Sequence, residues 1–261
     1  MKVLELFELS GKVGIVTGAA QNLGRQSALA LAEAGADVAI CDLLETQGEQ
    51  TCSDIKSLGR RCLFGKVDVT RPEEIADFVR WTLDSLGKID ILVNNVGIPC
   101  TGRRLEDEDE ESWGRVIETN LTSVFSFSKV VAKHMIERGE GGVILNMGSI
   151  AGMIINNITP RHNVPYCVSK AGVLHLTRGM ASDWAQYGIR VNAIAPGHMM
   201  TDQIGYMDQY PEIGERVLAN TPLKRLGQVD ELKGTLIYLA SNASSFMTGS
   251  VIVIDGGITI W

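Results

Sequence analysis

Tyr166 and Lys170, four residues apart, are the side chains of this sequence best suited to acid/base chemistry. In a helix, residues i and i+4 lie on one face, so the phenol and the ammonium would be neighbours. A free phenol titrates near pH ~10, but an adjacent ammonium stabilises the phenolate and lowers its pKa. We therefore expect a proton donor and acceptor here, with Ser149 a short loop upstream. Taken alone, the same Tyr-Lys spacing is also common on helix surfaces.

A second group of residues has the features of a nucleotide site. Thr17–Gly24 reads TGAAQNLG and leads from an apolar run directly into a helical pattern. Small residues let the backbone approach a pyrophosphate, and a helix N-terminus offers free N–H groups and the positive end of its dipole. A tight strand-to-helix turn without a ligand explains the same residues equally well.

The next apolar run ends in Asp42, about 20 residues beyond the glycines, where a carboxylate can accept hydrogen bonds from an adenosine ribose. A 2′-phosphate would meet Asp42 as a like charge, and residues 19–22 contain no Arg or Lys to offset it. Charge therefore favours NAD over NADP as the cofactor. The alternative interpretation of Asp42 is a solvated strand end.

An alternation of strands and helices must position these side chains. Short β-branched runs alternate with longer amphipathic stretches from about residue 12 onward, which is typical of βαβ units and a parallel sheet. The seven expected strands are Val13–Thr17, Asp37–Cys41, Cys62–Val67, Ile89–Val93, Gly142–Asn146, Arg190–Ala195 and Ser250–Ile254. Helical spacing is present in Leu23–Ala34, Pro72–Leu86, Trp113–Arg138 and Tyr166–Gln186.

The predicted fold is therefore α/β: a doubly wound, Rossmann-like, seven-stranded parallel sheet with helices on both faces, in one domain over residues 1–261. Residues 198–228 break the alternation, and we expect them to form an insertion that caps a site at the carboxyl edge of the sheet. The acidic run Glu106–Glu111 is expected to precede a helix beginning near Ser112, where carboxylates favour the positive end of the helix dipole.

Further residues at the predicted strand ends resemble the short-chain dehydrogenase/reductase family. Asp68-Val69 follows the third strand and Asn94-Asn95-Val96-Gly97 the fourth, similar to the Asp-Val pair and the NNAG motif of that family. The resemblance, which includes the TGxxxGxG motif, covers Lys12–Gly257. Asn22 stands where the family has its middle glycine, and Val96 replaces the alanine of NNAG. Because Asn tolerates left-handed backbone conformations, we expect the turn to persist.

The resemblance implies reversible hydride transfer between a nicotinamide and the carbon of an alcohol or ketone. It implies that Tyr166 transfers the proton, that Ser149 holds and polarises the substrate oxygen, and that Lys170 binds the nicotinamide ribose. Asn120 would hold a water in a proton relay with Lys170, and a hydrogen-bonded helix kink is its alternative explanation. The residues expected to hold NAD are Gly18, Gln21, Asn22, Leu23, Asp42, Asp68, Val69, Asn94, Gly97, Tyr166, Lys170, Pro196, Gly197, Met199 and Thr201.

The segment between Ser149 and Tyr166 is unusually polar for a pocket wall, which fits a sugar, polyol or sugar acid better than a steroid or fatty acyl chain. The residues expected to contact the substrate are Ser149, Asn156, Asn157, Arg161, His162 and His198. Arg161, with both histidines, would neutralise an anionic substrate group. A solvated loop in which Arg161 meets a surface acid is the alternative.

Two other substrate classes remain open: a 3-ketoacyl group, which Asp42 and the polar loop disfavour, and a small cyclic or aromatic diol. A protein of a different class, a non-catalytic NAD-binding regulatory protein, is disfavoured because Asn120, Ser149, Tyr166 and Lys170 are all present.

Composition restricts the partners and the location. Apolar residues make up 45% and charged residues 21%, the balance of a chain that buries a core. The net charge of −7 offers no basic surface to nucleic acid or anionic lipid, and no uncharged stretch reads as a membrane span. Glu5 and Glu8 interrupt the apolar start, so we expect no secretory leader and a cytoplasmic location.

The spacing of the five cysteines and four histidines predicts neither a disulfide framework nor a metal site, and reduced packing thiols are expected. At the C-terminus, Ile258, Ile260 and Trp261 would expose an apolar patch on a monomer. Because the family that the chain resembles is typically tetrameric or dimeric, we expect a homotetramer. Ending in an aromatic residue is also similar to its sugar and polyol dehydrogenases.

Overall fold

A computed structural model describes residues 2–100, 102–155, 163–201 and 210–260. Its strands form one parallel sheet in the order β3-β2-β1-β4-β5-β6-β7. The strands are β1 (Val13–Thr17), β2 (Asp37–Asp42), β3 (Cys62–Lys66), β4 (Ile91–Asn94), β5 (Gly142–Met147), β6 (Ile189–Pro196) and β7 (Val251–Ile254). The predicted seven-stranded, doubly wound fold is thus confirmed, and each strand lies within two residues of its expected bounds.

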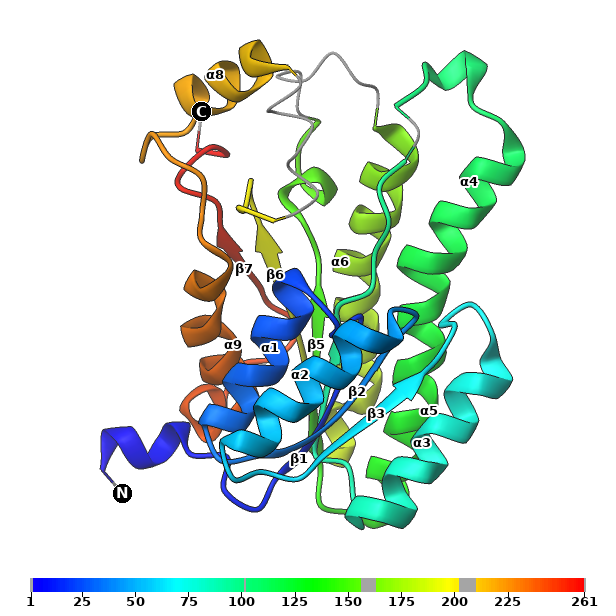
Figure 1. Cartoon of the computed structure of the whole chain (residues 1–261), viewed down its shortest axis with the longest axis vertical. Helices are drawn as coiled ribbons and strands as arrows, with labels where there is room; N and C mark the ends of the chain where they lie inside the picture. Colours follow the sequence, from blue (N-terminus) through cyan, green and yellow to red (C-terminus); the bar gives the residue numbers. More distant parts are fainter. Residues whose placement is uncertain (1, 101, 156–162, 202–209, 261) are drawn as a thin grey trace.

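Helices cover both faces of the sheet (Figure 1). In the described part of the chain they are α1 (Asn22–Glu33), α2 (Glu45–Ser57), α3 (Pro72–Leu86), α4 (Glu110–Ile117), α5 (Ser123–Arg138), α6 (Val164–Trp184), α8 (Pro211–Asn220) and α9 (Lys233–Ala240). None of these helices combines the length and apolar character needed to cross a lipid bilayer.

Alternation of side chains along the strands divides the core into two apolar layers. Val16 packs into the layer that contains Leu31 of α1 and Leu236 of α9, and α2 contributes to the same layer. Ile15, the next residue on β1, points to the other layer with Phe127 of α5, which also contains side chains of α3 and α6. A parallel sheet that is covered on both faces requires such runs of apolar residues.

The helix predicted over Trp113–Arg138 begins earlier and is interrupted. Asp109 caps α4 by accepting a hydrogen bond from the Ser112 main-chain nitrogen (2.7 Å), and Glu110 and Glu111 lie in the first turn, as the acidic run predicts. A five-residue π-helical turn, Glu118–Thr122, separates α4 from α5. Single π turns of this kind are frequent at functional sites.

The segment that follows α8 packs on the chain beyond β7. Leu223 donates a main-chain hydrogen bond to the Gly256 carbonyl (3.1 Å), and a Cβ atom at Gly257 would lie 2.8 Å from Pro222. Of the two isoleucines expected in a C-terminal apolar patch, Ile258 is buried within the chain and Ile260 is 72% exposed. Trp261 lies outside the described residues.

Candidate active site

The order of the strands reverses between β1 and β4, since the chain proceeds from β1 to β2 and β3 on one side and from β4 to β7 on the other. Loops at the carboxyl ends of the strands diverge at such a reversal and leave a crevice for ligands. The predicted site residues follow β1, β2, β3, β4, β5 and β6 at this edge. The topology therefore assembles one site from segments far apart in the sequence.

Backbone geometry forms the turn between β1 and α1. Gly18 has φ 63° and Asn22 has φ 51°, so Asn22 adopts the left-handed conformation that the sequence expectation required of it. A Cβ atom at Gly24 would lie 1.9 Å from the Gly18 carbonyl oxygen, and only glycine fits there. The turn therefore stays tight and leads directly into the N-terminus of α1, where the helix dipole favours an anion.

Asn95 fixes this turn from the neighbouring strand end. Its side-chain amide donates to the carbonyl oxygens of Thr17 (3.1 Å) and Gly18 (2.9 Å), while its main-chain nitrogen donates to the Thr17 hydroxyl (3.0 Å). Sequence reasoning did not include Asn95 among the site residues. Its place in the Asn-Asn motif was the only signal, and the motif does not tell which of its two amides serves the turn.

Asn94, the other amide of the motif, is buried below the crevice. Its Nδ2 atom donates to the Ser128 hydroxyl and to Asn146 Oδ1, both at 2.9 Å, and Asn146 donates in turn to the Thr177 hydroxyl (2.9 Å). This network links β4 and β5 to α5 and α6. The side chain of Asn94 therefore positions the strands, and a cofactor contact by this residue stays a prediction for its main chain.

The Asp42 carboxylate closes the corner between the turn and α2. One oxygen accepts a hydrogen bond from the Ala20 main-chain nitrogen (3.0 Å) and the other from that of Leu44 (3.1 Å). Each carboxylate oxygen has two acceptor positions, so both remain able to accept a further hydroxyl hydrogen. Asp42 thus has the acceptors and the place that ribose recognition requires.

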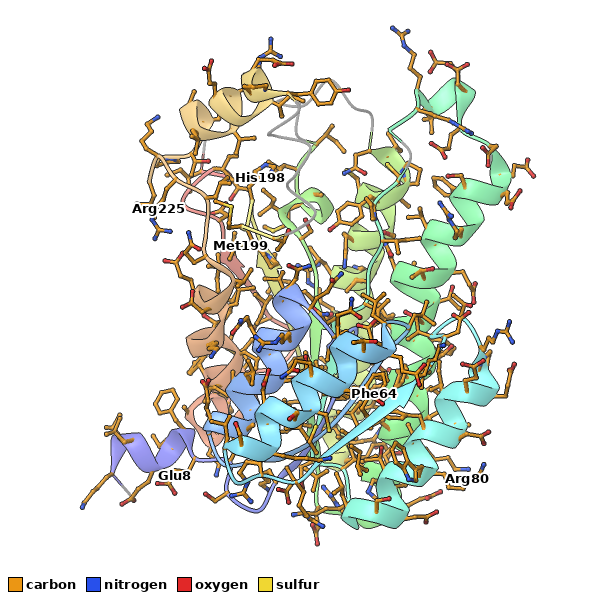
Figure 2. All side chains as sticks on the ribbon, viewed as in Figure 1. Glu8, Phe64, Arg80, His198, Met199 and Arg225 are labelled. Carbon is orange, nitrogen blue, oxygen red and sulfur yellow. The ribbon has the colours of Figure 1, made fainter. Side chains whose placement is uncertain are left out.

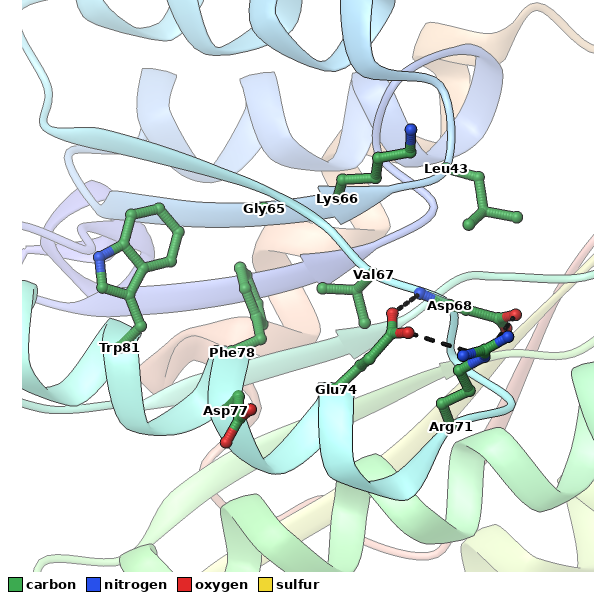
Figure 3. A pocket seen from close by; sticks show the side chains of 10 residues that line it. All are labelled: Leu43, Gly65, Lys66, Val67, Asp68, Arg71, Glu74, Asp77, Phe78 and Trp81. Carbon is green, nitrogen blue, oxygen red and sulfur yellow. Dashed lines mark hydrogen bonds and ion pairs between the residues drawn. The ribbon is translucent and has the colours of Figure 1, made fainter.

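The Asp68-Val69 pair follows β3. The Asp68 carboxylate accepts hydrogen bonds from the Thr70 hydroxyl (2.7 Å) and main-chain nitrogen (2.9 Å), which hold its pKa below the ordinary value, and Val69 is buried. The Arg71 guanidinium lies between Asp68 (3.7 Å) and Glu74 (3.6 Å). Figure 3 shows the guanidinium in contact with both carboxylates, and Glu74 also accepts a hydrogen bond from the Asp68 main-chain nitrogen (2.8 Å).

A groove of about 680 Å³ runs along the outer edge of the sheet from this point (Figure 3). Leu43 and Asp68 lie at one end, and Phe78 and Trp81 of α3 line the other. In the described part of the chain, none of the four predicted catalytic residues borders this groove. It adjoins the expected adenosine site and is not the place of the reaction.

The predicted catalytic residues meet on the far side of β4. Lys170 is 3% exposed, and its Nζ atom donates to the Met147 carbonyl oxygen (2.8 Å) and lies 5.7 Å from the centre of the Tyr166 ring. A Cβ atom at Gly97 would lie only 3.2 Å from Nζ, so the absence of a side chain lets the β4 loop pack closely on the ammonium. Burial lowers the pKa of Lys170 to about 8.

Tyr166 points toward Ser149, whose hydroxyl hydrogen-bonds its phenol and also accepts from the Ala151 main-chain nitrogen (3.1 Å). Burial raises the pKa of Tyr166 above its ordinary value, and the hydrogen bond from Ser149 offsets only part of that rise. The net shift is therefore opposite to the lowering expected from Lys170. Desolvation of the phenolate makes the largest contribution to this rise.

Asn120 lies in the π turn and is fully buried. Its side chain exchanges two hydrogen bonds with the main chain of Ile98, at 2.8 and 2.9 Å, and donates to the Ser169 hydroxyl (3.2 Å). Ser169 in turn donates to the Tyr166 carbonyl oxygen (2.8 Å). The predicted helix kink is confirmed, and it connects the β4 loop to the helix that bears Tyr166 and Lys170.

Cys100, Asn163 and Cys167 lie in the surroundings of Tyr166 but were not among the site residues predicted from the sequence. The Cys100 thiol hydrogen-bonds Asn163 Oδ1 (2.7 Å), which joins the β4 loop to the start of α6. Both cysteines near the phenol, Cys100 and Cys167, contribute to the raised pKa of Tyr166. Nothing in the spacing of Cys100 could have indicated a partner 63 residues away.

Four of the predicted substrate residues, Asn156, Asn157, Arg161 and His162, lie outside the described residues. His198 is placed beyond β6, where its carbonyl accepts a hydrogen bond from Gly227 (3.0 Å). Figure 2 shows His198 next to Met199 at the upper end of the sheet. Burial lowers the pKa of His198, which makes the imidazole neutral unless an anion approaches it.

Backbone contacts hold the remaining predicted cofactor residues after β6. Gly197 donates to the Ile254 carbonyl (2.9 Å), and a Cβ atom there would lie 2.7 Å from the Asp255 Cα, so Pro196-Gly197 passes close to β7. Met199 is buried and pairs with Gly227 in a parallel bridge, and Thr201 is half-buried two residues later. Among the described residues, no cluster of three or more His, Cys, Asp or Glu side chains is arranged to hold a metal ion.

Comparisons with known proteins agree with this geometry. A family model described as enoyl-(acyl carrier protein) reductase matches residues 18–259. The chain is 37% identical over 255 residues to the 2-dehydro-3-deoxy-D-gluconate 5-dehydrogenase of Escherichia coli K12, covering 98% of both chains. A short-chain type dehydrogenase/reductase from Mycobacterium marinum superposes with a TM-score of 0.94 at 40% identity, covering 99% of both chains. A gluconate 5-dehydrogenase from Burkholderia cenocepacia, solved with NADP and tartrate, superposes with a TM-score of 0.92 at 34% identity over the full length of both chains.

Proposed function

Because the chain belongs to the short-chain dehydrogenase/reductase family and is an oxidoreductase acting on CH–OH groups, we propose that it oxidises and reduces a sugar, polyol or sugar acid with NAD. The observation that carries this proposal is the convergence of Ser149, Tyr166, Lys170 and Asn120 at the strand reversal. The same four positions were expected from the sequence.

The site fits a nicotinamide dinucleotide. The tight turn at Gly18 leads into the N-terminus of α1, Asp42 keeps acceptor positions open, and Gly97 lets the β4 loop approach Lys170 closely. When bound, the nicotinamide supplies or takes the hydride. Thr201 and Met199, beyond β6, would hold its carboxamide end.

The residues of the chain handle the proton and the substrate oxygen. We assign to Ser149 and Tyr166 hydrogen bonds to the reacting oxygen, with Tyr166 giving its proton to a ketone or accepting it from an alcohol. Burial favours the neutral phenol, so the Lys170 ammonium, 5.7 Å from the ring centre, would help to stabilise the phenolate during alcohol oxidation. Asn120 would hold a relay water through the acceptor positions that its bonds to Ile98 leave open.

Charge at the ribose corner supports NAD over NADP. Asp42 would repel a 2′-phosphate, and the two cations of the adjoining groove are already paired: Lys66 with Glu45 (3.4 Å), and Arg71 with Asp68 and Glu74. The relative from Burkholderia cenocepacia was solved with NADP, so the family fold accepts either cofactor. In this chain the preference therefore depends on Asp42.

The substrate class rests on the polar segment before α6 and on the relatives. Two of the proteins to which the chain is similar are named for acting on gluconate or a 2-dehydro-3-deoxy-gluconate. A carboxylate in the substrate would also favour protonation of His198. We therefore infer a polyhydroxylated substrate that bears an anionic group.

We also propose that the chain forms a homotetramer, whose contacts would include the exposed Ile260.

The test is NADH or NADPH formation at alkaline pH over a panel of polyols, aldoses, sugar acids and phosphorylated sugars. We expect turnover with a sugar acid and NAD. Turnover with 3-ketoacyl or cyclic diol compounds alone would replace the proposed substrate class, and NAD binding without turnover on any compound would favour a regulatory protein.

A further inference from the structure

Helix α2 packs on β3 with a register that places two cysteines opposite each other. A Cβ atom at Gly48 would lie 2.0 Å from the Phe64 ring, so this part of α2 crosses directly over Phe64. Cys52 lies one turn after Gly48, and Cys62 lies two residues before Phe64 on the same strand face. Four residues of helix and two of strand both advance about 6 Å, so the two cysteines must face each other.

The contacts of the two thiols agree with this register. Cys52 and Cys62 are 5% and 4% exposed in the same apolar cluster, and their side chains interact, while the Cys62 thiol donates a hydrogen bond to the Leu63 carbonyl oxygen (3.7 Å). Lys56, one helical turn beyond Cys52, adds a nearby ammonium. The interaction with Cys62, followed by Lys56, lowers the pKa of Cys52 to about 7, and the pKa of Cys62 is raised. Cys52 is therefore the more acidic thiol of the pair.

We propose that Cys52 and Cys62 form a redox-active dithiol, which a hydroperoxide converts into a disulfide that joins α2 to β3. This goes beyond the sequence expectation that the cysteines only pack the core, and it does not depend on the substrate or the cofactor of the enzyme. In a reducing compartment the resting form is the dithiol.

The oxidation of the dithiol proceeds in two steps. The Cys52 thiolate attacks one oxygen of the hydroperoxide, the O–O bond breaks, and the leaving alkoxide or hydroxide takes up a proton. The Cys62 sulfur then attacks the Cys52 sulfenic sulfur, and hydroxide leaves as water with the Cys62 proton. Overall, two thiols lose two electrons and two protons, and the hydroperoxide is reduced to water and an alcohol, or to two waters for hydrogen peroxide.

The disulfide would close a short loop of the chain, residues 52–62, between two packed elements. Cross-linking restricts the unfolded chain, so we expect the melting temperature of the oxidised form to rise by about 5 °C. Dithiothreitol should return it to the starting value, because the bond is reversible by thiol exchange.

The full-length chain is treated with enough hydrogen peroxide to oxidise completely a small-molecule dithiol at the same concentration. The remaining thiols are then alkylated, and the chain is digested with trypsin and a glutamate-specific protease. We expect residues 50–56 and 62–66 to be recovered as one linked peptide that dithiothreitol separates. Recovery of both peptides alkylated, or linkage of either to another cysteine, would overturn the proposal. This measurement needs no variant.

Variants then assign the two roles. In Cys62→Ala, the link should be lost and Cys52 should be trapped by dimedone as its sulfenic acid. In Cys52→Ala, dimedone should leave residue 62 unlabelled. The matched control Cys100→Ser, which removes a half-buried thiol elsewhere, should still form the 52–62 link. Equal dimedone labelling of Cys52 and Cys62 would contradict the assignment of Cys52 as the attacking thiolate.

Discussion

Asn120 and Ile98 are joined by two reciprocal hydrogen bonds, from Ile98 N to Asn120 Oδ1 and from Asn120 Nδ2 to the Ile98 carbonyl. The contact connects a π turn in one helix to the loop after β4, and the same amide reaches α6 through Ser169. Three segments of the active site thus depend on one buried side chain.

Asn120→Ala should therefore impair both stability and activity. Removing the amide leaves the part-buried N–H of Ile98 without its acceptor, and we expect the free energy of unfolding to fall by about 1–3 kcal/mol. The displaced β4 loop should lower kcat by about 100-fold. Urea denaturation and steady-state kinetics measure the two effects. Asn220→Ala, at an exposed position of α8, is the matched control and should change neither.

Tyr166→Phe tests the acid/base assignment. Loss of the hydroxyl removes the proton donor while retaining the ring, so kcat should fall by about 10²–10⁴-fold with NAD affinity unchanged. Fluorescence titration of the cofactor and initial rates separate the two quantities. Tyr187→Phe removes an exposed phenol and should behave as the parent enzyme. Retention of near-normal turnover in Tyr166→Phe would refute the mechanism.

The buried Lys170 should make stability depend on pH in a defined window. Burial lowers its pKa from 10.5 to about 8 in the folded protein, so the unfolded chain binds this proton more tightly. The contribution of Lys170 to the free energy of unfolding is complete above its unfolded-state pKa of 10.5, and it is lost as pH falls through its folded-state pKa of about 8. Between pH 8 and pH 10, the parent enzyme should gain about 2 kcal/mol more than Lys170→Met in its free energy of unfolding. If the free energy of unfolding changed with pH equally in the two proteins, the pKa of Lys170 would not be lowered by burial.

The double substitution Asp42→Ala, Leu43→Arg should reverse the cofactor preference. It replaces the charge that repels a 2′-phosphate with one that binds it, and the NADP to NAD ratio of kcat/KM should rise by at least about 100-fold. Leu43→Arg alone serves as the control: because this variant keeps Asp42, it should still prefer NAD. An unchanged ratio in the double variant would place ribose recognition elsewhere.

The sheet could be predicted almost completely because each strand is a short apolar run that must be buried on both faces. The site could be predicted where motifs fall at strand ends, as with Asp42, or at the start of a helix, as with Tyr166. Asn22 is a further success, since its left-handed backbone follows from the chemistry of asparagine and the glycine it replaces.

Properties that depend on the surroundings in three dimensions could not be predicted in this way. The spacing of Tyr166 and Lys170 gives their proximity but not their desolvation, and desolvation decides the sign of the pKa shift of the phenol. Likewise, the sequence shows two adjacent amides after β4, and only packing assigns Asn94 to the interior and Asn95 to the turn.

The π turn at Glu118–Thr122 contains one residue more than an α-helical path between the same two ends would need. That additional residue rotates α4 relative to α5 by about 100° around the shared axis, so the two segments need not present one continuous stripe of side chains. The helix can therefore face the active site along its first part and the sheet along its second. Deletion of a single residue within the turn would realign the two halves and turn the Asn120 amide away from Ile98.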